Sequence, residues 1–200
     1  MVVSSLRRTS EEHVTVCLED GTEIPSTAVV IAELLLFTGK DLDEETLEQL
    51  HFLSQRALAQ EKAIKLLSYT RMSSKELRDK LVRKGTDASI AEAAVEKLQE
   101  LRLLDDAEYA AAVVRHYTAK GYGTARVRAE LSRRGVDRDL WEEALENAPP
   151  SEEKIDRFVQ TKLKDPDDRE QVRKVSAALY RRGYSWDEIR AAINRYSESL

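Results

Sequence analysis

The sequence predicts a mainly α-helical protein: three tandem three-helix repeats of the helix-turn-helix type, preceded by a small N-terminal β-hairpin and a helix. Two observations lead to this prediction. A junction of two basic residues and a glycine recurs at Gly85, Gly135 and Gly183, at intervals of 50 and 48 residues. Around each glycine the apolar residues also recur in the same order. Self-similarity at a fixed period is the sequence signature of a repeat architecture.

The three copies align position by position on either side of the glycine. Each has a leucine four residues before it, an alanine nine residues after it and a larger apolar residue ten residues after it. These spacings give one apolar face to each of two helices joined at the glycine. The aligned residues are Leu81, Leu131 and Leu179, then Ala94, Ala144 and Ala192, then Val95, Leu145 and Ile193.

Each junction also carries helix-end chemistry. Glycine adopts the left-handed conformation at a helix C-terminus at no steric cost, and basic residues before it suit the negative end of the helix dipole. An Asp or Ser two residues after the glycine is suited to cap the next helix. The basic pairs are Arg83-Lys84, Arg133-Arg134 and Arg181-Arg182, and the caps are Asp87, Asp137 and Ser185.

A further helix is expected before each helix pair, over residues 57–70, 106–118 and 151–164. Asp105 and Glu108 form a capping-box pattern for the second of these, and Ser151 follows two prolines at the start of the third. We therefore expect an acidic N-terminal extension at 1–56 and three-helix repeats at 57–105, 106–150 and 151–200.

The N-terminal extension begins with a strand pattern. Val14, Val16 and Leu18 alternate with less apolar residues, and a Glu-Asp-Gly turn leads to a short return segment through Ile24. This pattern predicts a β-hairpin, in which Pro25 makes the return segment an edge strand.

Two helical segments are expected after the hairpin. Residues 27–37 favour a short buried helix that ends near Gly39, and their Val-Val-Ile content leaves a strand as the alternative. From Asp43 a helical pattern through Leu47, Leu50 and Leu53 continues into the first repeat.

Composition limits the classes of protein to which the chain can belong. It has 200 residues, of which 42% are hydrophobic and 34% charged, enough to fold without metals or disulfides. The single cysteine, Cys17, cannot form an internal bridge, and no signal segment opens the chain. The longest apolar run, 28–37, contains Glu33 and is too short to span a bilayer. We expect a cytoplasmic monomer without a membrane contact.

The sequence contains no pattern typical of a catalytic or metal site. His13, His51 and His116 are far apart and lack neighbouring ligand residues. There is no phosphate-binding glycine loop, nucleophile elbow or Cys–His pair, and Asp105 with Asp106 is better explained as a helix cap than as a catalytic carboxylate pair. We therefore expect no enzyme activity, no metal and no cofactor.

Charge is divided unequally between segments. Residues 1–56 carry 4 Lys/Arg against 11 Asp/Glu, whereas residues 115–138, around the middle helix of the second repeat, carry 7 against 2. The third helices are acidic, and carboxylates in the position of a recognition helix would be repelled by duplex DNA. This disfavours groove readout and leaves the basic middle helices free to meet phosphates or acidic protein surfaces. The carboxylates are Glu92, Glu96 and Glu100 in the first repeat and Glu142, Glu143 and Glu146 in the second.

Two longer motifs make the chain similar to a known family. From Asp105 it reads DDAEYAAAVVRHYTAKGYGTARVRAELSRRGVDRDLWEEAL, and from Ser73 it reads SSKELRDKLVRKG. Leu-Leu-Asp-Asp at 103–106, Gly-Tyr-Gly at 121–123 and the Arg-Arg-Gly junction, in this order, resemble the bacterial regulatory protein family RecX. The resemblance extends from about Val14 to the C-terminus.

The resemblance implies a fold and a partner. It implies an elongated, curved array of three-helix units that binds the RecA filament on single-stranded DNA and lies in its helical groove. Such proteins restrain filament growth, ATP hydrolysis, strand exchange and repressor cleavage without catalysis of their own. Some also bind single-stranded or double-stranded DNA themselves.

The resemblance and the basic clusters together indicate candidate contact residues. The structural motif is Asp105, Asp106, Gly121 and Gly123 with the junction glycines Gly85, Gly135 and Gly183. Two alternatives stay open: a DNA-binding protein that uses the same helices on phosphates alone, and a helical-repeat scaffold for another protein. The candidate binding residues are Arg78, Arg83, Lys84, Arg115, Lys120, Tyr122, Arg126, Arg128, Arg133 and Arg134.

Overall fold

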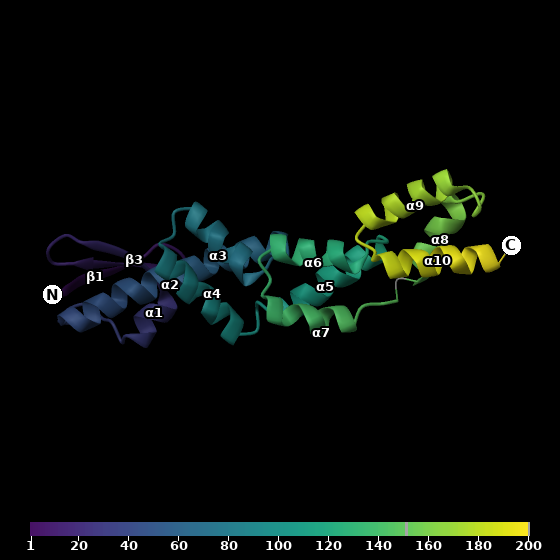
Figure 1. Ribbon diagram of the computed structural model, residues 1–200. Helices are drawn as coiled ribbons and strands as arrows, with labels where there is room; N and C mark the ends of the chain where they lie inside the picture. The colour runs from purple at the N-terminus through teal and green to yellow at the C-terminus, as the bar shows by residue number, and fades with distance from the viewer. Residues whose placement is uncertain (151, 200) are drawn as a thin grey trace. The chain divides into compact units, whose positions relative to one another are not determined.

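The computed structural model of the protein describes residues 1–150 and 152–199. They form two compact units, Met1–Leu104 and Asp105–Leu200. Helices dominate both units, as the sequence predicts, and a small sheet lies at the N-terminal end of the first (Figure 1). Ser151, at which the sequence places the start of the third repeat, lies outside the described residues.

The sheet is antiparallel and has three strands. The strands β1 (Val3–Arg8), β2 (His13–Leu18) and β3 (Glu23–Thr27) lie in the order β1-β2-β3. The predicted hairpin is the pair β2 and β3. Because β3 is an edge strand, it accommodates Pro25, which has no N–H group to donate to a second neighbour.

Strand β1 was not predicted from the sequence. Most of its residues are polar and exposed, and Val3 is its one fully buried residue, so no alternation of apolar residues marks it. A bulge between Val3 and Ser5 also shifts its register on β2. The hydrogen bonds of the ladder to β2, rather than an apolar face, define this strand.

A short helix, α1 (Ala28–Glu33), begins at the Thr27 cap within the predicted segment 27–37. The prediction that this helix is buried was wrong. Val30 is buried, but Val29 and Phe37 are 73% and 60% exposed. A helix of six residues turns less than two times, so it presents only a small part of its surface to the core.

The long helix α2 (Glu44–Tyr69) begins at the Asp43 cap and continues without a break past residue 56. It contains no glycine or proline that would end it. The helix therefore joins two cores: Leu50 packs in a cluster with residues of the sheet, and Ala63 packs in the core of the first repeat.

Helices α3 (Ser74–Arg83) and α4 (Ala88–Glu100) complete the first repeat by packing on α2 and on each other. Leu77 and Leu81 of α3 meet Val95 of α4 in a buried cluster. Leu81 and Val95 are positions that the repeat alignment assigned to the apolar faces.

The second repeat contains α5 (Asp106–Ala119), α6 (Thr124–Arg133) and α7 (Trp141–Glu146), with a 3-10 turn, η1 (Arg138–Leu140), before α7. The helices enclose a core of their own. Its members include Val114, Val127 and Leu131.

The third repeat contains α8 (Glu152–Lys162), α9 (Arg169–Arg181) and α10 (Trp186–Glu198). It also has a separate core, which includes Val159, Leu179 and Ile189. None of the described helices in the chain is long and apolar enough to cross a membrane.

The three basic–glycine junctions have the predicted geometry. Gly85, Gly135 and Gly183 have φ values of 88°, 67° and 93°, in the left-handed region. The residue two positions after each glycine caps the following helix, because its side chain accepts a hydrogen bond from a backbone N–H group there. These caps are Asp87, Asp137 and Ser185.

Candidate interaction surface

Two of the candidate arginines form ion pairs within their own repeat. Arg78 of α3 donates to Glu92 of α4 at 2.9 Å. Arg128 of α6 donates to both carboxylate oxygens of Glu142 of α7, at 2.8 and 3.0 Å. The pairs occupy equivalent positions, seven residues before and seven residues after the junction glycine. Each pair links the middle helix of its repeat to the third helix.

These ion pairs connect the basic middle helix of a repeat to its acidic third helix. The acidic third helix neutralises part of the basic middle helix in the first and second repeats. In the third repeat the equivalent positions hold Ser176 and Arg190, so the same pair is not possible there. The number of cations available to a partner is therefore smaller than the sequence count of Lys and Arg.

A buried carboxylate lies within the basic helix α6. Glu130 is only 5% exposed. The Nε of Arg134 donates to one of its oxygens at 2.7 Å, and the Nε of Arg133 donates to the other at 3.0 Å. Arg134 also donates to the Tyr109 hydroxyl at 2.6 Å and lies over its ring. Arg134 thus links the end of α6 to α5 through Tyr109, whereas Arg133 pairs with Glu130 on its own helix.

The two arginines keep Glu130 in its charged form. The hydrogen bond from Arg133 is the largest cause that lowers the pKa of Glu130 to about 2, and the bond from Arg134 adds to it, against burial, which raises the pKa. Burial lowers the pKa of Arg134, but its hydrogen bonds to Tyr109 and Glu130 raise that pKa above its ordinary value. A buried charge is costly without a partner, so this cluster has a structural role.

Five candidate cations are exposed and have no carboxylate partner among residues 1–150 and 152–199. In the first unit they lie at the end of α3, and in the second unit they lie at the end of α5 and near the start of α6. We call this set the unpaired cations. It consists of Arg83, Lys84, Arg115, Lys120 and Arg126.

The Gly121-Tyr122-Gly123 motif connects α5 to α6. Gly121 has a φ of 77° and follows the end of α5. The ring of Tyr122 lies 5.6 Å from that of Tyr117, and the Arg126 guanidinium lies 6.0 Å from the Tyr122 ring centre. Gly123 is the N-cap of α6 and has no side chain to cap it. The motif therefore sets the start of the basic helix.

The Asp-Asp motif lies at the start of α5. The carboxylate of Asp105 accepts hydrogen bonds from the Ala107 and Glu108 N–H groups at 2.9 and 3.0 Å. This confirms the helix-cap interpretation of Asp105. Asp106 lies in the first turn, where its negative charge interacts favourably with the positive end of the helix dipole.

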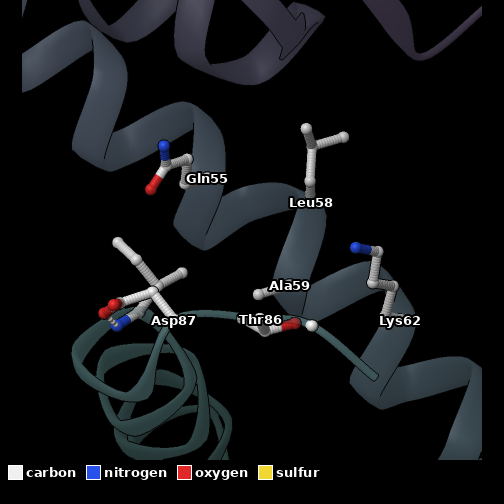
Figure 2. A pocket seen from close by; sticks show the side chains of 8 residues that line it. Gln55, Leu58, Ala59, Lys62, Thr86 and Asp87 are labelled. Carbon is white, nitrogen blue, oxygen red and sulfur yellow. Dashed lines mark hydrogen bonds between the residues drawn. The ribbon is translucent and has the colours of Figure 1, made fainter. Parts of the chain in front are cut away.

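A pocket of about 260 Å³ lies beside the first junction. Its walls include Gln55, Leu58 and Lys62 of α2, and Thr86 and Asp87 of the turn between α3 and α4 (Figure 2). Asp87 already caps α4, so its carboxylate is used at the helix end. No group of three or more His, Cys, Asp or Glu in the described part of the chain could hold a metal ion.

Two residues with a role in these contacts, Glu130 and Arg182, were not among the candidate residues named from the sequence. Glu130 follows Val127 by three residues and precedes Leu131, a spacing that places it on the buried face of α6. Arg182 belongs to the third copy of the basic pair, and its guanidinium lies 4.6 Å from the centre of the Phe158 ring. The spacing of Glu130 and the basic pair that contains Arg182 are visible in the sequence. Their contacts with other residues form only in the folded chain.

Three family models match the chain in order. They describe the first, second and third three-helix domains of RecX, and they match residues 59–98, 105–145 and 152–193. The chain belongs to the RecX family. The matched ranges follow the three helical repeats of the structure.

Relatives named regulatory protein RecX cover most of the chain. The relative from Bacillus licheniformis is 30% identical over 195 residues, which cover 94% of this chain and 74% of the relative. The relative from Xanthomonas axonopodis pv. citri is 37% identical over 140 residues, which cover 66% of this chain and 83% of the relative. These matches support a regulatory role of the RecX type.

Solved structures share the fold of the RecX family. A crystal structure of a regulatory protein RecX has a TM-score of 0.78 and 22% identity, with 96% of this chain and 98% of that chain covered. The crystal structure of RecX from Lactobacillus salivarius has a TM-score of 0.64 and 25% identity, with 70% of this chain and 96% of that chain covered.

Proposed function

We propose that the protein is a non-enzymatic, cytoplasmic regulator that binds the RecA filament on single-stranded DNA in its helical groove. In this role it inhibits filament growth, ATP hydrolysis, strand exchange and repressor cleavage. The observation that carries the proposal is the match of all three RecX domains, in order, along one chain.

The repeat architecture gives this proposal a physical basis. Several weak contacts made by one chain to neighbouring subunits of a polymer act together, so an assembled filament binds more tightly than a free subunit. The unpaired cations of the first and second repeats supply contacts of one sign, suited to phosphates or to acidic side chains. We assign the contact to these cations and treat Arg78, Arg128 and Arg134 as residues that hold helices together.

A DNA-binding protein is the second candidate, because the same unpaired cations can meet phosphates without RecA. The exposed carboxylates of α4 and α7 count against binding in a DNA groove. Glu96 and Glu100 of α4, and Glu143 and Glu146 of α7, are all exposed. A scaffold for an unrelated protein is the third candidate.

One comparison separates the three candidates. The purified chain is titrated with bare single-stranded DNA, with RecA-coated single-stranded DNA and with unassembled RecA, at two salt concentrations. Preference for the coated strand is the expected result. Equal and steeply salt-dependent binding to both DNA forms would instead support the DNA-binding candidate. Binding to none of the three would support the scaffold.

A further inference from the structure

The second and third repeats meet through backbone atoms. Their hydrophobic cores are separate clusters, one around Leu131 and the other around Leu179. Between these cores, the start of α6 contacts the turn between α9 and α10. The Gly123 N–H group donates to the Arg182 carbonyl oxygen at 2.9 Å, and the Ala125 N–H group donates to the Gly183 carbonyl oxygen at 3.1 Å.

These hydrogen bonds take the place of a helix cap. The first N–H groups of a helix and its last carbonyl groups have no partner within the helix. Gly123 has no side chain that could satisfy the N–H groups of α6. The carbonyl groups that follow α9 instead satisfy the N–H groups of the N-cap Gly123 and of Ala125 in the first turn, and the negative end of α9 thereby meets the positive end of α6.

The backbones approach so closely that a side chain fits on neither side. A Cβ atom on Gly123 would lie 2.4 Å from the Gly183 carbonyl oxygen. A Cβ atom on Gly183 would lie 2.4 Å from the Arg126 amide nitrogen. The obstructing atoms belong to the backbone, which cannot rotate away as a flexible side chain can. A side chain at either position would therefore force the two repeats apart.

Two arginines have their backbones at this contact, Arg126 and Arg182. The backbone of Arg126 lies against Gly183, the residue that follows Arg182. Neither arginine has a carboxylate partner in the described part of the chain. Each guanidinium lies over an aromatic ring, Tyr122 for Arg126 and Phe158 for Arg182. A guanidinium held in this way keeps N–H groups at its edge that can donate to an anion.

We propose that Gly123 and Gly183 form a backbone clasp that holds the third repeat on the second. The clasp keeps Arg126 and Arg182 together as one surface for the filament, which neither repeat makes alone. The glycines are thus positioning residues. The positioning role rests on the proposed function, whereas the existence of the clasp does not.

Amide hydrogen exchange of the unaltered, full-length chain tests the clasp directly. The Gly123 and Ala125 amides donate across the clasp, while the Thr124 amide between them has no acceptor among the described residues. Gly123 and Ala125 should therefore exchange at least about tenfold more slowly than Thr124, after correction for intrinsic rates. Similar exchange of all three amides would overturn the clasp, and this measurement needs no variant.

Gly123→Ala separates the collision from backbone strain. Gly123 has a φ of −81°, which alanine adopts freely, so the added Cβ acts through its collision with the third repeat. Gly85→Ala is the matched control, because Gly85 has a φ of 88° and no atom within 4 Å of an added Cβ. Exchange of the Ala125 amide should rise about tenfold in the first variant and stay within about twofold in the control. Unchanged protection in Gly123→Ala would contradict the clasp.

A double-mutant cycle tests the positioning role. Dissociation constants for RecA-coated single-stranded DNA are measured for Arg126→Ala, Arg182→Ala and the double variant, in the unaltered chain and with Gly123→Ala. With Gly123 in place, each single variant should raise the dissociation constant by some factor. The factor for the double variant should differ from the product of the two single factors by about threefold or more. With Gly123→Ala the factor for the double variant should equal the product of the two single factors to within about 1.5-fold, because separated residues act independently.

The outcomes distinguish the clasp from the proposed function. Coupling that survives Gly123→Ala, or no coupling in the unaltered chain, would refute the positioning role. If the unaltered chain did not bind RecA-coated DNA, the proposed function and the positioning role would both fail. The exchange rates would still show whether the clasp exists.

Discussion

An arginine on a helix surface can neutralise a nearby carboxylate or remain available to a partner. The two cases lie eight residues apart, near the start of α6 and at its C-cap. Arg134 is 25% exposed and is bound to Glu130 and Tyr109. Arg126 is exposed and has no carboxylate partner in the described part of the chain. The expected effects of replacing them differ accordingly.

Arg134→Ala should lower the free energy of unfolding by about 2–4 kcal/mol, because it removes one partner of a buried carboxylate. Arg133 remains beside Glu130 and limits the loss. Urea unfolding of the full chain measures the effect. Arg126→Ala is the control and should leave the unfolding midpoint unchanged within error. Equal midpoints for the two variants would contradict the structural role of Arg134.

Glu130 should make stability depend on acidic pH. Its pKa is about 2 in the folded chain, below the ordinary value of 4.5. A lowered carboxylate pKa stabilises the fold fully above the ordinary value, and this contribution disappears as the pH falls through the folded pKa. The loss should therefore fall between about pH 5 and pH 2. Thermal unfolding across this range should show a flatter pH profile for Glu130→Gln, and an unchanged slope would contradict the assignment.

At the scale of helices, the first and second repeats share an ion pair between their middle and third helices. In the second repeat one guanidinium nitrogen of Arg128 donates to both oxygens of Glu142, but the two side chains are 46% and 67% exposed. Water and salt screen exposed pairs, so the pair contributes orientation more than stability.

A cycle of Arg128→Ala, Glu142→Ala and the double variant should give a coupling free energy below about 1 kcal/mol. The coupling should shrink further in high salt, because screening weakens exposed ion pairs. Chemical denaturation at low and high salt measures both effects. A coupling several times larger, and insensitive to salt, would show that the pair is buried in solution.

At the scale of the whole chain, the proposed binding depends on repeats that act together. Arg83 and Lys84 belong to the first repeat, and Arg126 belongs to the second. Contacts made by one chain to neighbouring subunits reinforce each other, so a loss in one repeat weakens the whole interaction.

Arg83→Glu with Lys84→Glu, and separately Arg126→Glu, should each weaken inhibition of RecA-filament ATP hydrolysis by about threefold to tenfold. The effect of the triple variant should exceed either one. Circular dichroism should show unchanged helicity, because these side chains are exposed. Arg190→Glu, a charge reversal at another exposed position, is the matched control. Equal inhibition by all variants would remove the unpaired cations from the contact surface.

The repeats could be inferred from the sequence because their signals are local. Junction glycines, caps and apolar spacings act within a few residues, and Gly85, Gly135 and Gly183 adopt the predicted left-handed conformation. The same reasoning found the hairpin and the Asp105 cap. It missed β1, whose polar residues are held by a neighbouring strand.

The availability of each cation could not be read from the sequence, because it depends on residues that are distant along the chain. Glu142 neutralises Arg128 from fourteen residues away, and no local pattern distinguishes Arg128 from Arg126. The contact of Gly123 with Gly183 joins residues in two different repeats. Helix formation depends on short-range backbone preferences, whereas ion pairing and close backbone approach arise only when packed helices bring separate segments together.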